Sequence, residues 1–223
     1  MGATSVWAAV TEPELDAIGA ASWRSWPSGV PLRVTPFRDD AVLAAKGFAR
    51  EHGAGCVLKL AVRDGLHERT AIDANVLNEA LTAAIAADAE YLGVVDDLQI
   101  RAAEEAMGLK FPMAWRKHVQ STAWFRGGWM RTGAYVWLYT PSETAELISA
   151  WGEAATDRAG MLAIGGDGGG EMITLDARDP NTAVTLTPMI GIGWADSIEQ
   201  AASIEPFIRA IEEGSFEFVF ERS

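Results

Sequence analysis

The glycine-rich segment IGGDGGGEMITLD, residues 164–176, is the stretch of this sequence that most resembles a ligand-binding loop. A phosphate-binding P-loop needs a Lys followed by Ser or Thr after its glycines, and none follows here. A dinucleotide-binding loop needs a helix after the glycines, whereas EMITLD predicts a strand. A calcium loop needs several spaced carboxylates, and only Asp167 and Glu171 are close. The pattern therefore favours a tight turn between two strands, because glycine tolerates the positive φ angles of such turns.

The other reactive residue types form no recognised catalytic or metal-binding pattern. The histidines His52, His67 and His118 have neither HxxxH nor HExxH spacing, so a zinc site is not expected. The single cysteine, Cys56, lies in the apolar run GCVLKLAV and is expected to be a buried strand residue. A GxSxG nucleophile motif is absent. We therefore expect no catalytic residue, no metal and no cofactor, and a protein that is not an enzyme.

The charge of the chain restricts the class of partner. The 223 residues include 31 acidic and 18 basic side chains, a net charge of −13. Direct binding to nucleic acid or to an anionic membrane needs clustered Lys and Arg, so neither is expected. An acidic surface suits a basic protein partner, although acidity can also serve solubility alone. Nine tryptophans are a high number, and some of them could contact a partner.

The sequence begins without a basic segment followed by an apolar one, which a secretory signal would show. No apolar stretch reaches the ~18 residues that a membrane span requires. We therefore expect a cytoplasmic protein.

Residues 1–95 predict a small α/β domain, and residues 96–223 a second domain. The first is expected to contain strands at 4–10, 32–37 and 55–62, with helices at 12–21, 39–52 and 76–90, where the first residues of the last helix could equally pair as a strand. The boundary lies near 93–97. Residues 96–223 hold 10 basic and 19 acidic residues, a net charge of −9, so the acidity is concentrated in the second domain.

The second domain is expected to alternate helices with paired strands. A helix at 97–107 is followed by a helix that opens at Pro112, and two strands then pair around a turn near Thr132 and Gly133. Ser142 is predicted to cap a helix at 143–154. Three strands follow at MLAIGG, EMITLDA and TAVTLTPM, and Ser197 is predicted to cap a final amphipathic helix. The alternating run FEFVFE predicts a closing strand.

This order of motifs resembles the SUKH superfamily of fungal regulators and bacterial immunity proteins, over about 120 residues. The matching elements are a proline with a following aromatic residue in a short helix, an Ile-Gly strand that enters a D-G-x-G-type turn, a strand that ends in Asp, and a last helix that docks on the sheet. They correspond to Pro112 and Trp115, residues 164–170, Leu175 and Asp176, and Phe207 and Ile208. The resemblance implies an α+β fold with a mixed sheet and flanking helices, no catalytic residues, and a role in protein binding.

The N-terminal half weakly resembles a degenerate ADP-ribosyltransferase-like domain, and also bacterial domains with a WRxxPP-type loop, matched here by Trp23, Arg24 and Pro27. In a transferase of the Arg–Ser–Glu type, an Arg on the first strand binds NAD. Trp7 or Ala8 stands at that position here, while Thr35 fits the Ser/Thr position and Glu79 could supply the glutamate. An inactive relative, an unrelated α/β fold and an active enzyme remain open as readings of this half.

Three functions follow from these patterns. The first is a cytoplasmic immunity protein that binds and neutralises a basic toxin domain, such as a nuclease. The alternatives are an NAD-using ADP-ribosyltransferase-like enzyme and a non-catalytic regulatory scaffold. For the first function, the expected partner-binding face combines tryptophans with acidic residues. These are Trp124, Trp129, Trp137, Glu143, Glu146, Asp167 and Glu171.

Overall fold

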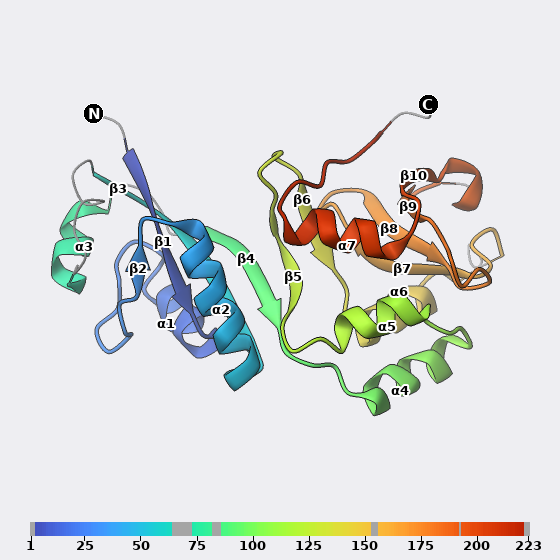
Figure 1. Ribbon diagram of the computed structural model, residues 1–223, viewed down its shortest axis with the longest axis horizontal. Helices are drawn as coiled ribbons and strands as arrows, with labels where there is room; N and C mark the ends of the chain where they lie inside the picture. The colour runs from blue at the N-terminus through green and yellow to red at the C-terminus, as the bar shows by residue number, and fades with distance from the viewer. Residues whose placement is uncertain (1–2, 64–72, 82–85, 153–155, 192, 221–223) are drawn as a thin grey trace. The chain divides into compact units, whose positions relative to one another are not determined.

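A computed structural model describes residues 3–63, 73–81, 86–152, 156–191 and 193–220. The chain divides into two compact units, Met1–Gly93 and Val94–Ser223 (Figure 1). The sequence placed its boundary between residues 95 and 96. The expected α+β class is confirmed, because both units combine helices with antiparallel strands. Within the described residues, no helix is both long and apolar enough to cross a membrane.

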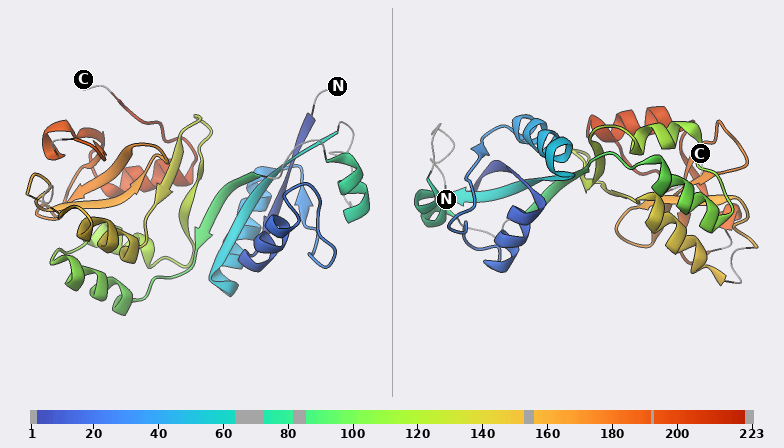
Figure 2. Two further views of the ribbon diagram at one scale, coloured as in Figure 1. Left: turned by 180° about the vertical axis from the view of Figure 1, so that it is seen from behind. Right: turned by 90° about the horizontal axis from the view of Figure 1, so that it is seen from below.

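The N-terminal unit has an antiparallel sheet in the order β4-β3-β1-β2. Its strands are β1 (Ala3–Val10), β2 (Val34–Thr35), β3 (Ala54–Arg63) and β4 (Ala86–Leu92). Its helices are α1 (Glu12–Ala20), α2 (Arg38–His52) and α3 (Ala74–Ala80). Figures 1 and 2 show α2 on one face of this sheet and α1 on the other.

The core on the α1 face follows the alternation of the strands. Val6 of β1 and Leu58 of β3 pack with Ile18 of α1 and Leu77 of α3. Cys56 belongs to the same core, so its predicted position in a buried strand is confirmed. Burial raises the pKa of the Cys56 thiol to about 12, with further contributions from nearby acidic side chains, so the thiol stays protonated at neutral pH.

The C-terminal unit has a sheet in the order β10-β9-β8-β7-β6-β5. Its strands are β5 (Trp124–Trp129), β6 (Tyr135–Leu138), β7 (Met161–Gly166), β8 (Glu171–Asp176), β9 (Val184–Pro188) and β10 (Ile198–Ala201). Its helices are α4 (Asp97–Met107), α5 (Met113–Val119), α6 (Pro141–Ser149) and α7 (Ile204–Glu212), with a 3-10 turn, η2, at Gly193–Asp196. The described pairings in this sheet are antiparallel, which corrects the mixed sheet that the resemblance implied.

Helices cover both faces of this second sheet: α7 lies over one face and α6 over the other (Figures 1 and 2). On the α6 face, Leu147 packs against a cluster of Met161, Ala163 and Met172. The Thr144 hydroxyl of α6 is fully buried and donates a hydrogen bond of 2.9 Å to the carbonyl of Ala163. This bond anchors α6 to β7.

A buried carboxylate holds the corner between α4 and α5. Glu104 is 1% exposed and lies in α4, which begins at a capping box and ends at Gly108 in the left-handed conformation. Its oxygens accept from the backbone N–H of Phe111 at 3.0 Å, from Lys110 Nζ at 2.9 Å and from Arg116 Nη1 at 3.1 Å. Because both cations neutralise the charge, the carboxylate is tolerated in the interior.

Two helix starts differ from the prediction, and a proline explains both. The helix expected from Ser142 begins at Pro141 with Thr140 as its cap, since proline is favoured at the first helical position. The segment expected to become helical after Ser197 first forms β10, and α7 follows the cap at Ser203. Pro206 is tolerated only in the first turn of a helix, so α7 has to begin just before it.

Two further segments differ in type. The helix expected over residues 76–90 ends at Ala80, and strand β4 follows from Ala86. Pairing with β3 there outweighs the helical preference of an alanine-rich and acidic segment. The closing strand expected at FEFVFE, residues 216–221, is also wrong over residues 216–220, which lie in no regular element, and Glu221 lies outside the described residues.

Candidate functional site: an aromatic hollow with acidic residues

The β5–β6 hairpin carries a row of aromatic side chains. Trp129 pairs with Tyr135 across the two strands, and their rings meet edge to face with centroids 5.1 Å apart. The rings of Tyr135 and Trp137 are nearly parallel, at 11°, with centroids 6.5 Å apart. Residues two apart on a strand point to the same face, so alternation within β6 produces this row.

Glycines make room for these rings. A Cβ atom on Gly127, which pairs with Trp137, would lie 2.1 Å from the Trp137 ring. A Cβ atom on Gly168 would lie 2.7 Å from the Tyr135 ring, and the φ angle of Gly168 is +77°. The glycine-rich segment therefore lets its backbone approach Tyr135 closely, which any larger residue would prevent.

The turn between β7 and β8 is organised by Asp167. One carboxylate oxygen, Oδ1, accepts from the backbone N–H of Gly169 at 2.7 Å and of Glu171 at 3.1 Å. The predicted strand–turn–strand is confirmed. Burial and the negative charge of Asp167 raise the pKa of the Glu171 carboxyl above its usual value. Two carboxylates thus lie close enough at this turn to repel each other.

A second wall comes from the irregular segment 215–220. The Thr132 hydroxyl donates to the carbonyl of Phe216. The side-chain amide of Gln200 bonds both backbone groups of Val219, donating to its carbonyl at 2.8 Å and accepting from its N–H at 2.9 Å. Phe218 contacts both neighbouring rings, with centroid distances of 4.9 Å to Phe216 and 5.9 Å to Phe220. The segment therefore presents aromatic side chains without belonging to the sheet.

Between these two walls lies a surface cavity of about 440 Å³, which we call the aromatic hollow. Trp129 is 51% exposed and Phe220 61% exposed, which is unusual for such large apolar side chains. Among the described residues, the lining contains the carboxylates of Asp167 and Glu217 but no Lys or Arg. The complete lining is Trp129, Thr132, Gly133, Ala134, Tyr135, Asp167, Glu217, Phe218 and Phe220.

The structure brings together four of the seven residues predicted for a partner-binding face. Trp129 and Asp167 line the hollow, and Glu171 is next to Asp167. Trp137 continues the aromatic row, but the guanidinium of Arg126 lies over its ring at 4.3 Å. Trp137 is therefore already covered by a side chain of its own chain.

Glu143 holds the arginine, Arg126, that lies over the Trp137 ring. Its carboxylate accepts from Arg126 Nη2 at 2.5 Å and from the backbone N–H of Thr140 at 2.7 Å. Burial raises the pKa of Glu143, but the hydrogen bonds from Thr140 and Arg126 outweigh it and hold this pKa below its usual value. Glu143 thus caps α6 and positions Arg126 over Trp137.

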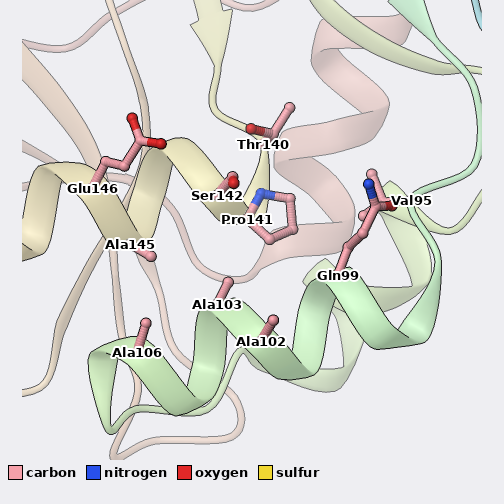
Figure 3. Close-up of a pocket in the computed structure, with 10 residues that line it drawn as sticks. All are labelled: Val95, Gln99, Ala102, Ala103, Ala106, Thr140, Pro141, Ser142, Ala145 and Glu146. Carbon is pink, nitrogen blue, oxygen red and sulfur yellow. The ribbon is translucent and has the colours of Figure 1, made fainter.

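The remaining two predicted residues lie elsewhere. Trp124 is fully buried, with its ring 5.7 Å from that of His118, so its placement on a surface was wrong. Glu146 is exposed on α6 and lines a different groove of about 490 Å³ between α4 and α6. Figure 3 shows small side chains of α4, such as Ala102 and Ala106, facing α6 across this groove. It has no aromatic lining residue, so Glu146 does not share a site with Trp129.

Of the residues that line the hollow, sequence reasoning assigned only Trp129 and Asp167 to the binding face, and it missed the large side chains of Tyr135, Glu217, Phe218 and Phe220. A signal for them was present, because aromatic residues alternate in both AYVWLYT and FEFVFE. That alternation predicts strands, and it does not show which of the rings stay exposed.

The structure places two residues of the transferase alternative, Trp7 and Thr35, on neighbouring strands and the third, Glu79, on helix α3. Trp7 lies opposite Thr35 in the β1–β2 register, and the Thr35 hydroxyl contacts Asp40 of α2. Glu79 is exposed on α3, a helix that packs through Leu77 into the core on the α1 face. Among the described residues, no group of three or more His, Cys, Asp or Glu could hold a metal ion, and His67 lies outside them.

Comparison of the sequence with models of known protein families and with curated proteins finds no match. The SUKH resemblance of residues 96–223 therefore stands on the order of its motifs alone.

Proposed function

We propose that this protein is a non-enzymatic binding module whose C-terminal unit binds a basic protein through the aromatic hollow. One observation carries the proposal: an exposed tryptophan, Trp129, lines a cavity together with two carboxylates and, within the part of the chain that the structure describes, no basic side chain. Tryptophan is among the residues that contribute most to protein interfaces. An acidic surface also accelerates the encounter with a basic partner.

The charge of the unit supports the same partner class. Residues 96–223 carry a net charge of −9, and the SUKH resemblance associates such a domain with protein recognition. In its most specific form, the proposal is a cytoplasmic immunity protein that occludes a basic toxin domain, such as a nuclease. A regulatory scaffold would use the same hollow with a different basic protein.

The proposal can be tested with a toxin domain encoded beside this gene. Cells that express the toxin are expected to grow when the full-length protein is co-expressed, and growth should fail with Trp129→Ala. Leu98→Ala is a matched control, because Leu98 is 76% exposed on α4 and lies outside the hollow. Rescue that is equally strong with Trp129→Ala and with the wild type would contradict the role of the hollow.

A further inference from the structure

We infer that the aromatic hollow binds an arginine side chain of its partner, stacked on the exposed rings and paired with Asp167. This inference rests on the proposed function and names the chemical group that the hollow would take. The molecule itself contains a similar arrangement, which serves as a template, at Trp137 of the same aromatic row.

The template is the arrangement around Trp137. There an arginine, Arg126, lies over the indole ring at 4.3 Å and pairs with the carboxylate of Glu143 at 2.5 Å. Guanidinium groups prefer this combination, because their flat face stacks on a ring while their edge donates to a carboxylate. All three components of the template belong to the C-terminal unit.

The hollow repeats two of the three components. Trp129 and Tyr135 supply the rings, and Asp167 supplies the carboxylate. Among the described residues, no arginine or lysine lies over the Trp129 ring or forms an ion pair with Asp167. The component that the hollow lacks is the guanidinium, and a partner can supply it.

The charges around the turn favour a bound cation. Asp167 uses Oδ1 for two backbone N–H groups, while no described contact occupies Oδ2. Glu171 beside it and Glu217 on the opposite wall have no ion pair among the described residues. Burial, and secondly the negative charge of Asp167, raise the pKa of Glu171. A cation between the walls would relieve the repulsion between these carboxylates.

Arginine fits better than lysine because of the shape of its guanidinium. Rings line both walls, and a flat guanidinium can contact rings that an ammonium group would touch only at one point. The cavity of about 440 Å³ also exceeds the volume of one small ion and admits a side chain with its stem.

The test is a titration of the full-length protein with three peptides of six residues, followed by calorimetry. One peptide contains arginine, the second lysine, and the third citrulline, which has the shape of arginine without its charge. We expect the arginine peptide to bind more tightly than the lysine peptide, and the citrulline peptide to show no binding.

Variants separate a specific site from general attraction to an acidic protein. Trp129→Ala and Asp167→Asn should each weaken the arginine peptide about tenfold. Asparagine keeps an oxygen acceptor for the turn, so Asp167→Asn removes charge with little change of structure. Glu79→Gln removes the same charge from exposed α3, and its affinity should match the wild type. Circular dichroism and melting curves check that each variant folds.

Three results would overturn the inference: equal affinity for the arginine and citrulline peptides, equal or tighter binding of the lysine peptide, or equal weakening by all three variants. A dimer that dissociates on Trp129→Ala would show that a second copy of the chain fills the hollow, and this result would also overturn the inference. If the peptides fail while Trp129→Ala still abolishes toxin rescue, the proposed function stands and only arginine recognition is lost.

Discussion

Carboxylates are used in opposite ways at two places in the C-terminal unit. At the corner of α4 and α5, Glu104 is fully buried, and Lys110 and Arg116 neutralise its charge. At the edge of the aromatic hollow, Asp167 and Glu171 lie near each other, and neither forms an ion pair among the described residues. The first arrangement completes a network inside the fold. The second leaves negative charge unsatisfied at the surface, which is the condition for attracting something from outside.

This comparison predicts that the two places respond differently to mutation. Changes at the corner should lower stability and leave binding unchanged. Changes at the hollow should weaken binding and leave stability nearly unchanged. A site that violated this separation would show that the hollow is part of the structural framework.

The largest effect is expected for Glu104→Ala. The substitution leaves Arg116 and the backbone N–H of Phe111 without their buried acceptor. We expect the free energy of unfolding to fall by about 3 kcal/mol, measured by urea denaturation. Glu105→Ala, at an exposed neighbouring position, should change it by less than about 0.5 kcal/mol. Similar losses in both variants would contradict a special role for Glu104.

The next effect concerns the support of the aromatic row. Gly127→Ala places a Cβ atom 2.1 Å from the Trp137 ring, so the ring has to move. We expect a loss of about 2 kcal/mol in the free energy of unfolding and weaker binding of the arginine peptide. Gly170→Ala is the control, because a Cβ atom there meets nothing within 4 Å. A stable Gly127→Ala variant would mean that the row tolerates displacement.

A smaller effect on stability is expected at the hollow itself. Trp129→Ala removes a ring that is half exposed and makes its described ring contact only with Tyr135. The free energy of unfolding should change by less than about 1 kcal/mol, while the arginine peptide loses about 1.4 kcal/mol of binding free energy, which is tenfold in affinity. A large loss of stability with unchanged binding would show that Trp129 supports the fold and does not bind the partner.

The smallest effect concerns two glutamates, Glu171 and Glu143, whose substitution should change the free energy of unfolding in opposite directions. The raised pKa of Glu171 means that its contribution to stability is present below about pH 4.5, the ordinary value, and is lost as pH rises through the raised pKa. The lowered pKa of Glu143 gives stability above pH 4.5 that is lost as pH falls through the lowered pKa. At pH 7, Glu171→Gln should therefore be slightly stabilising and Glu143→Gln destabilising. Denaturation at pH 7 and pH 4 measures both, and equal signs at pH 7 would contradict the electrostatic assignment.

The regular elements could be predicted where local signals agree. The helix over residues 97–107 was predicted with its observed bounds, because Asp96 caps it, apolar residues follow helical spacing and Gly108 ends it. The glycine-rich turn was predicted because each competing loop lacks a required residue. Segments whose state depends on a distant partner could not be predicted in this way. Residues 86–92 form a strand because β3 is available to pair with them, which the local composition does not reveal.

The sequence predicted which types of residue would form the site, but not which individual residues would belong to it. Trp124 and Trp129 lie at opposite ends of the same strand, yet one is fully buried and the other is half exposed. Residue type alone could not separate them, because the difference depends on what packs over each position. The second wall of the hollow lies about 90 residues after Trp129 in the chain, so only the folded arrangement shows that they meet.

The two hydrogen bonds between the side-chain amide of Gln200 and the backbone of Val219 affect the dynamics of the hollow. The described ties of residues 215–220 to the sheet are few, and two of them come from this one side-chain amide. Such a segment can open locally at a much lower free energy than global unfolding. Affinity then scales with the fraction of time that the wall is closed. Gln200, which does not line the hollow, would set how often the binding-competent state is populated, and hydrogen exchange at the Val219 amide would report that population.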